Sequence, residues 1–151
     1  MDLHYVLPTP SDEVLEVFEK KIKYRFNDRA RAREALQAAA GFNGDGNKDL
    51  ALIGDAILRL VIVNYGYTQN YTKGYISNVI TEKANNAYLA KQGFALEINN
   101  FVVRNNSQPT VGRKVMAATM EAIVGAVFLD CDQQIAPCVD VMAALGIFSP
   151  E

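Results

Sequence analysis

The chain has 151 residues, half of them hydrophobic, and a formal net charge of −2. This length and apolar content exclude a disordered chain and indicate one domain with a buried core. The near-balanced charge gives no sign of a polyanionic partner, so nucleic-acid binding has to be argued from individual residues. Cys131 and Cys138 stand in no metal-ligand pattern. We expect free thiols there, with a local disulfide as the alternative.

The N-terminal segment predicts a tail over residues 1–10 and a single domain over residues 11–151. The tail has no basic region followed by an apolar run, so we expect no signal peptide. No segment reaches about 18 uninterrupted apolar residues, so we expect no membrane span and no membrane partner. These patterns predict an intracellular protein, cytoplasmic or nuclear, with a mitochondrial location left open.

Helical periodicity begins directly after the tail. Ser11 is placed to cap a first helix, in which Val14, Phe18 and Ile22 recur at four-residue spacing. Asp28 is placed to cap a second helix, which we expect over residues 29–40.

A glycine and asparagine loop then precedes a long helix over about residues 48–65. This helix is apolar on nearly every face, as a central buried helix would be. Further helices are expected over residues 75–84, 86–92, 113–130 and 133–145, with Gly146 as the last C-cap. No segment predicts a strand, so the expected fold class is all-α.

Two acidic residues stand inside apolar helices: Asp55 in the long helix and Glu121 in the helix over 113–130. A buried, ionised carboxylate without a partner is unfavourable, and two such acids on two buried helices suggest that they meet. Converging carboxylates raise each other's pKa unless a cation lies between them. Magnesium is commonly held by one or two carboxylates plus substrate phosphates. The alternative is that each acid bonds to the backbone or pairs with Arg59 or Lys114.

Four segments carry a resemblance to a known family. NKDLALIGDAIL (47–58) resembles the signature helix of the ribonuclease III family, whose usual pattern is Glu-x-x-Glu-Phe-Leu-Gly-Asp-Ala. KVMAATMEAIVGAVFLD (114–130) resembles its second acidic helix. FEKKIKYRFNDRARAREAL (18–36) and ANNAYLAKQGFAL (84–96) resemble its opening helices and the segment between the acidic helices. The resemblance implies an all-helical ribonuclease III endonuclease-domain fold that forms a symmetric dimer.

The resemblance also implies the chemistry. Family members bind double-stranded RNA and hydrolyse phosphodiesters with magnesium, using four acids in each active site. Asp55 and Glu121 match two of these acids, whereas Ala51 and Ala118 stand where the other two are expected. Lys48 replaces the first signature glutamate. The remaining pair is sufficient for one magnesium ion, with manganese as a possible substitute, while a second ion is poorly supported.

Two functions remain open on this evidence. The first is a magnesium-dependent endoribonuclease acting on double-stranded or structured RNA, with Asp55 and Glu121 as catalytic residues and metal ligands. The alternative is a non-catalytic ribonuclease III-fold scaffold or RNA-binding protein, for example a ribosome-associated subunit. Retention of Asp55 and Glu121 favours the enzyme, and Ala51 and Ala118 favour the scaffold.

The sequence also suggests residues that would contact a second copy of the chain and RNA. The signature phenylalanine is replaced by Leu52, and we expect a homodimer interface around Leu52 and Ile53. Double-stranded RNA is read through its shape, phosphates and 2′-hydroxyls, so exposed basic and polar side chains are the RNA-binding candidates. They are Lys73, Asn78, Lys83, Asn85, Asn86, Arg104, Asn105, Asn106 and Arg113, and the alternative for each is a solvated surface residue. No separate double-stranded-RNA-binding domain is expected, so intrinsic RNA affinity should be weak and steeply salt-dependent.

Overall fold

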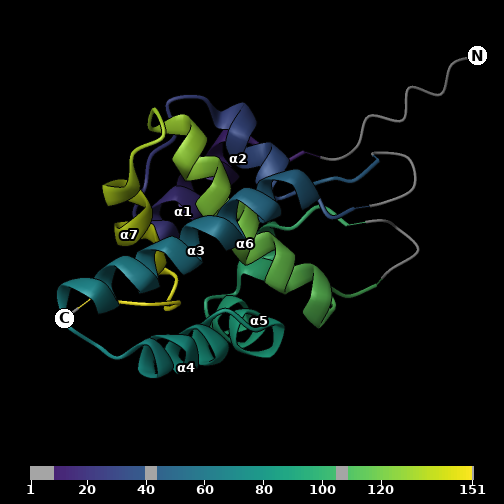
Figure 1. Ribbon diagram of the computed structural model, residues 1–151. Helices are drawn as coiled ribbons and strands as arrows, with labels where there is room; N and C mark the ends of the chain where they lie inside the picture. Colours follow the sequence, from purple (N-terminus) through teal and green to yellow (C-terminus); the bar gives the residue numbers. More distant parts are fainter. Residues whose placement is uncertain (1–8, 40–43, 105–108, 151) are drawn as a thin grey trace, which may run out of the picture.

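A computed structural model of the protein describes residues 9–39, 44–104 and 109–150. Most of the predicted tail, together with Asn105 and Asn106, lies outside these residues. Within them the chain is helical and forms no strand, which confirms the all-α prediction (Figure 1). The elements are α1 (Asp12–Ile22), α2 (Arg29–Ala35), α3 (Lys48–Thr68), α4 (Lys73–Lys83), α5 (Asn86–Ala95), the 3₁₀ helix η1 (Ile98–Phe101), α6 (Arg113–Asp130) and α7 (Ile135–Ala144).

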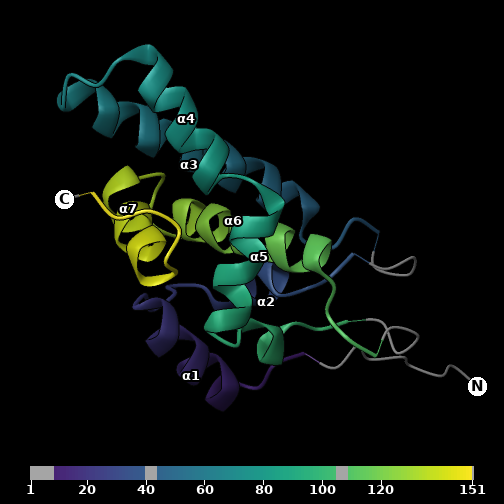
Figure 2. The same ribbon diagram turned by 90° about the horizontal axis from the view of Figure 1, so that it is seen from below.

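Helices α3 and α6 cross at the centre of the molecule, and the other elements are arranged around them. Figures 1 and 2 show α1 and α2 on one side of this pair and α4 and α5 on the other. Helix α7 packs beside the C-terminal half of α6, and α4 returns antiparallel along α3 (Figure 2). The side chains of Leu15, Phe18, Leu58, Met120 and Ile123 are fully buried between these helices.

The crossing of α3 and α6 depends on two glycines. A Cβ atom added at Gly54 would overlap the carbonyl oxygen of Glu121, and one added at Gly125 would overlap the carbonyl oxygen of Leu50. The two backbones therefore touch directly, which only glycine permits. Because Asp55 follows Gly54 in the chain, this contact brings its helix turn beside that of Glu121.

Side-chain hydrogen bonds hold the starts of helices α1, α2 and α3. Asn47 precedes α3, and its Nδ2 donates to the carbonyl of Ala35 at 2.8 Å and to Thr119 Oγ1 of α6 at 3.0 Å. The predicted caps Ser11 and Asp28 are confirmed, accepting from the backbone N–H of Val14 at 3.3 Å and of Ala30 at 3.0 Å. The α3 start is thus held against both α2 and α6.

The last residue of α6 anchors the turn between α1 and α2. Asp130 accepts hydrogen bonds from the Tyr24 hydroxyl at 2.6 Å and from the backbone N–H groups of Asn27 and Asp28 at 2.8 and 2.9 Å. Burial, followed by this bond to Asp130, raises the pKa of Tyr24 well above its usual range. The turn is therefore fastened to a residue distant in sequence.

Two predictions about the first two helices are wrong, one on the extent of α2 and one on the buried face of α1. The second helix was expected over residues 29–40 but ends at Ala35. Beyond it the chain pairs with Val103, whose N–H donates to Leu36 O and whose carbonyl accepts from Ala38 N, both at 2.9 Å. This extended pairing supplies the backbone bonds that a longer helix would have made. In α1, Val14 is exposed and Leu15 takes the buried position beside Phe18.

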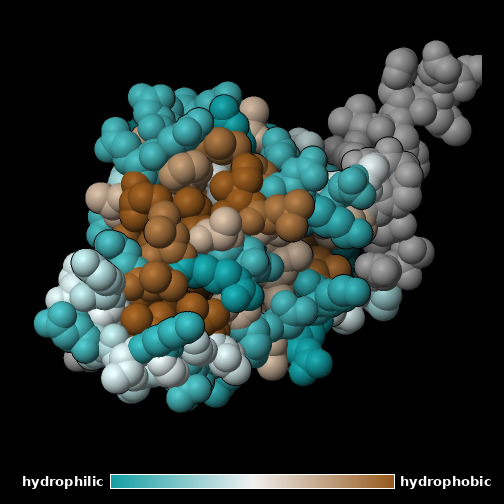
Figure 3. Space-filling model, in the orientation of Figure 1, coloured by the Kyte–Doolittle hydropathy of each residue, from teal (hydrophilic) through white to brown (hydrophobic). Residues whose placement is uncertain are grey.

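Helix α3 is not buried all round, contrary to expectation. Leu52 is 73% exposed and Tyr67 is 80% exposed, and Leu60 and Val63 are also exposed. Figure 3 shows hydrophobic surface gathered on this face over α3 and α6. The apolar pattern of the sequence therefore reflects two faces, one packed on α6 and one uncovered.

Length and composition alone would allow α3 to cross a membrane. This is weak evidence, because the core helix of a folded domain has the same character and Leu50, Leu58 and Ile62 of α3 are buried inside this one. The absence of a membrane partner stays a prediction.

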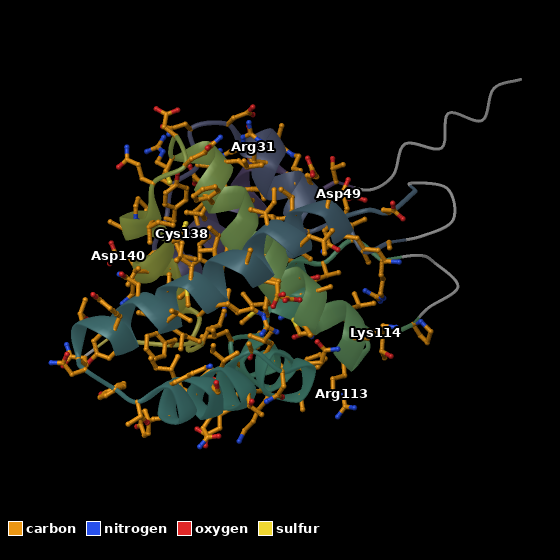
Figure 4. All side chains as sticks on the ribbon, viewed as in Figure 1. Arg31, Asp49, Arg113, Lys114, Cys138 and Asp140 are labelled. Atoms are coloured by element: carbon orange, nitrogen blue, oxygen red, sulfur yellow. The ribbon has the colours of Figure 1, made fainter. Side chains whose placement is uncertain are left out.

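Both cysteines are free, as expected. Cys138 lies buried in α7, far from Arg113 at the start of α6 (Figure 4). Burial raises the pKa of the Cys138 thiol to about 12.

Candidate active site

The structure brings Asp55 and Glu121 together. Asp55 projects from α3 and Glu121 from α6, and a side-chain hydrogen bond joins the two carboxyl groups. Burial, this hydrogen bond and the charge of Asp55 raise the pKa of Glu121 to about 8, against a smaller opposing effect of Arg59. Near neutral pH the Glu121 carboxyl therefore favours its protonated form.

Arg59 is the second partner of Asp55. It lies one helical turn further along α3, and its Nε is 3.2 Å from both Oδ1 and Oδ2 of Asp55. The side chain of Arg59 is 51% exposed and that of Asp55 is 37% exposed. The carboxylate is therefore neither isolated nor sealed from solvent.

These residues line an open cleft of about 600 Å³. Its wall contains both positive and negative groups, and Asp49 marks its position at the N-terminal end of α3 (Figure 4). The lining residues are Asp45, Lys48, Asp49, Ala51, Leu52, Asp55, Arg59, Ala84, Asn86 and Glu121.

The donor set fits one hard cation. Asp55 and Glu121 interact across the helix crossing and line the same cleft, and a divalent ion can bridge two carboxylates placed in this way. Among the described residues, no group of three or more His, Cys, Asp or Glu side chains is arranged to hold a metal. Ala51 lines the cleft and Ala118 packs against the core, and neither offers an oxygen. In the described part of the chain, no third carboxylate is therefore grouped with this pair.

The predicted RNA-binding residues that the structure describes are spread over several elements. Asn86 lines the cleft beside Asp55 and Glu121. Lys73 lines a separate groove of about 780 Å³ between α3 and α4, and Asn78 is exposed on α4. Arg104 is exposed, and Arg113 is exposed at the N-terminal end of α6, where Figure 4 places Lys114 beside it.

Two of the candidates serve local structure. Asn85 caps α5, accepting from the backbone N–H of Tyr88 at 2.8 Å, and its Nδ2 donates to the carbonyl of Thr81 at 2.8 Å. The Nζ of Lys83 donates to the Tyr88 hydroxyl at 3.2 Å and lies 4.6 Å from the centre of its ring. Their first role is to join α4 to α5, since both contacts bridge that turn.

Of the two predicted dimer residues, Leu52 is exposed at the rim of the cleft, whereas Ile53 packs against the core. The sequence did not point to Asp45 or Asp49, and it offered Arg59 only as an alternative partner for the two acids. Residues 48, 52, 55 and 59 recur at three- or four-residue spacing, which places them on one helical face. From this spacing, the sequence could have predicted that these four side chains line one site.

Comparison with known proteins assigns this arrangement to a family. The model of the Ribonuclease III domain matches residues 48–132, more than half of the chain and both acidic helices. Ribonuclease 3 of Nitratiruptor sp. is 29% identical over 122 residues, covering 77% of this chain and 54% of that protein. Ribonuclease 3 of Desulfotalea psychrophila is 30% identical over 127 residues, covering 75% and 52%. The chain thus spans about half the length of these curated relatives.

Solved structures agree on the fold. A nuclease domain of ribonuclease III from Campylobacter jejuni superposes with a TM-score of 0.76 at 21% identity, covering 87% of this chain and 92% of that chain. A second structure of that domain gives 0.71 at 22% identity and covers 88% and 92%. It is described for flexibility in a region involved in dimer formation. The helical arrangement predicted from the sequence is therefore confirmed.

Proposed function

Because the chain belongs to the ribonuclease III family, we propose that it is a metal-dependent endoribonuclease that hydrolyses phosphodiesters in double-stranded or structured RNA. The observation that carries this proposal is the Asp55–Glu121 carboxyl pair, hydrogen-bonded across two helices in an open cleft. A partly buried acid with a strongly raised pKa in a cleft is typical of a functional site.

Asp55 and Glu121 would hold one magnesium ion, or manganese in its place. When bound, that ion supplies positive charge at the scissile phosphate and lowers the pKa of a coordinated water. Glu121 has to release its proton to become a ligand, so the chain binds the ion more readily as pH rises towards about 8. Ala51 and Ala118 contribute nothing, which makes the site a reduced version of the four-acid arrangement.

RNA would lie across the cleft mouth. Lys48 and Asn86 line the cleft and are the side chains best placed to meet phosphate and 2′-hydroxyl groups there. Further contacts with RNA outside the cleft would come from Lys73, Asn78, Arg104 and Arg113. Asn85 and Lys83 would contribute less, because their polar atoms already bond within the protein. With so few cations, binding should be weak, and because few counterions would be released its salt dependence should be shallower than the sequence led us to expect.

A second copy of the chain would cover the exposed face of α3. An apolar face of this kind on a folded protein marks an interaction surface. Leu52 lies both on this face and at the rim of the cleft, so the interface would adjoin the active site. Ile53, which packs inward, would contribute little.

The cellular setting follows from the relatives, which are bacterial proteins. They give no support to a nuclear or mitochondrial location, and we infer an intracellular one.

Incubation of the purified protein with long double-stranded RNA and Mg²⁺ or Mn²⁺ tests the activity. We expect endonucleolytic products from the wild type and none from Glu121→Gln, which keeps the shape of the side chain but not its charge. Glu34→Gln, on the exposed surface of α2, is the matched control and should cut as the wild type does. Cleavage that is equal in Glu121→Gln would overturn the site. Absence of cleavage by a folded, metal-loaded wild type would favour the scaffold alternative.

A further inference from the structure

Arg59 occupies the atoms that a metal ion would need. Its Nε lies 3.2 Å from each of the two carboxylate oxygens of Asp55, so one guanidinium group engages the whole carboxylate. Arg59 also lines the cleft that contains Lys48, Asn86 and Glu121. The same side chain therefore faces both the metal ligand and the space where RNA phosphate would lie.

A guanidinium and a divalent cation cannot share Asp55 without cost. Both are positively charged, and at contact distance in a partly desolvated cleft their repulsion is large compared with thermal energy. Arg59 contacts both carboxylate oxygens of Asp55, so a cation that binds those oxygens would lie directly against the guanidinium group. Metal binding at Asp55 therefore requires Arg59 to move aside.

The geometry allows that movement. Arg59 is half exposed, and an ion pair between residues four apart on a helix surface is weak. A phosphodiester is a better partner for arginine, because two guanidinium N–H groups can bind two phosphate oxygens at once. RNA in the cleft can thus draw Arg59 away from Asp55.

We propose that Arg59 is a positioning residue that couples metal binding to RNA binding. It holds Asp55 while the cleft is empty and turns to a phosphate when RNA arrives, which leaves the Asp55 carboxylate to the ion. Linkage makes the effect reciprocal: RNA tightens metal binding by the same factor by which metal tightens RNA binding. This inference rests on the proposed function, since it takes Asp55 as a metal ligand and RNA as the substrate.

The test is a Mn²⁺ titration of the full chain, with free Mn²⁺ followed by electron paramagnetic resonance. It is performed with and without a short RNA duplex whose integrity is checked on a gel. Four variants accompany the wild type: Arg59→Met removes the charge, Arg59→Lys keeps it, and Asp55→Asn reports ions bound elsewhere or by the RNA alone. Arg33→Met is the matched control, because Arg33 pairs with Asp12 at 2.6 Å outside the cleft.

We expect Arg59→Met to bind Mn²⁺ about three- to tenfold more tightly than the wild type without RNA, the range for loss of one nearby, partly screened charge. The duplex should tighten Mn²⁺ binding by the wild type by a similar factor and should leave Arg59→Met unchanged. Arg59→Lys should behave more like the wild type, and Arg33→Met should match it.

Two failures are distinguishable. If Asp55→Asn loses the Mn²⁺ site but Arg59→Met binds no more tightly than the wild type, the role of Arg59 is overturned and the proposed function stands. If the duplex tightens both proteins equally, the coupling does not pass through Arg59 and the inference is overturned in the same way. If wild type and Asp55→Asn bind Mn²⁺ identically, Asp55 is no metal ligand, and both proposals fall.

Discussion

Gly54 and Glu121 touch backbone to backbone where α3 and α6 cross, with no room for a Cβ atom between Gly54 Cα and the Glu121 carbonyl. The relative position of Asp55 and Glu121 is therefore set by the main chain and only secondarily by side-chain packing. A site built this way is pre-positioned before any ligand arrives.

Gly54→Ala should separate the two helices. We expect a loss of about 2–3 kcal/mol in the free energy of unfolding, because a methyl group forced against a backbone carbonyl is overpacked and neither helix can yield locally. Urea denaturation measures it. Gly74→Ala is the control, since the added Cβ meets no atom within 4 Å in α4 and should stabilise by about 0.5–1 kcal/mol. Equal effects of the two substitutions would contradict the account of the crossing.

The sequence predicted the two acids and their helices because a charged residue in an apolar run is conspicuous. It could not show that Gly54 and Gly125 bring the acids together. A glycine within a helix does not reveal which other helix packs against it. The end of α2 was missed for a related reason. All five of residues 36–40 read as good helix formers, and the pairing of Leu36 and Ala38 with distant Val103 overrides that preference.

The exposed face of α3 was missed because hydropathy alone does not distinguish burial in the core from burial in an assembly. Arg59 was visible at a spacing of four from Asp55, yet the sequence left open whether the acid would take Arg59 or a metal. The structure shows that Asp55 takes Arg59 as a partner.

Stability should depend on pH through Glu121. Its pKa is raised to about 8 in the folded protein from an ordinary value of 4.5, so between these values the folded state binds more protons than the unfolded state. The free energy of unfolding should therefore fall as pH rises from about 4.5 to about 8. Urea denaturation in chelator from pH 5 to 9 measures this. Glu121→Gln should show a flatter profile; profiles of equal slope would contradict the raised pKa.

Restoring the missing acids should increase activity. Ala51→Glu together with Ala118→Asp places two carboxylates near Asp55 and Glu121, and we expect cleavage at least about tenfold faster, or ~1.4 kcal/mol of barrier. The crowded charges should lower stability in chelator, with recovery on addition of Mg²⁺, because an ion that binds only the folded state stabilises it. Cleavage rates and thermal melts measure both effects. A folded, metal-binding double variant that cuts no faster would place the deficit elsewhere.

The uncovered face of α3 should mediate dimerisation. Leu60→Glu puts a charge in the middle of that face, which should shift sedimentation at micromolar concentration towards the monomer. Val17→Glu makes the same change at an exposed position of α1 and should leave the association unchanged. A wild type that sediments as a monomer would remove the basis for the dimer.

The anchoring of the α1–α2 turn on Asp130 has a consequence for how the chain folds during its synthesis. Tyr24, Asn27 and Asp28 are made early, but the carboxylate that binds them is made more than a hundred residues later. While the chain is still growing, this turn lacks its hydrogen bonds to Asp130, and the first two helices can pack only loosely against each other. Completion of the N-terminal part therefore waits until the end of α6 has left the ribosome, so the whole domain closes as one late, cooperative event.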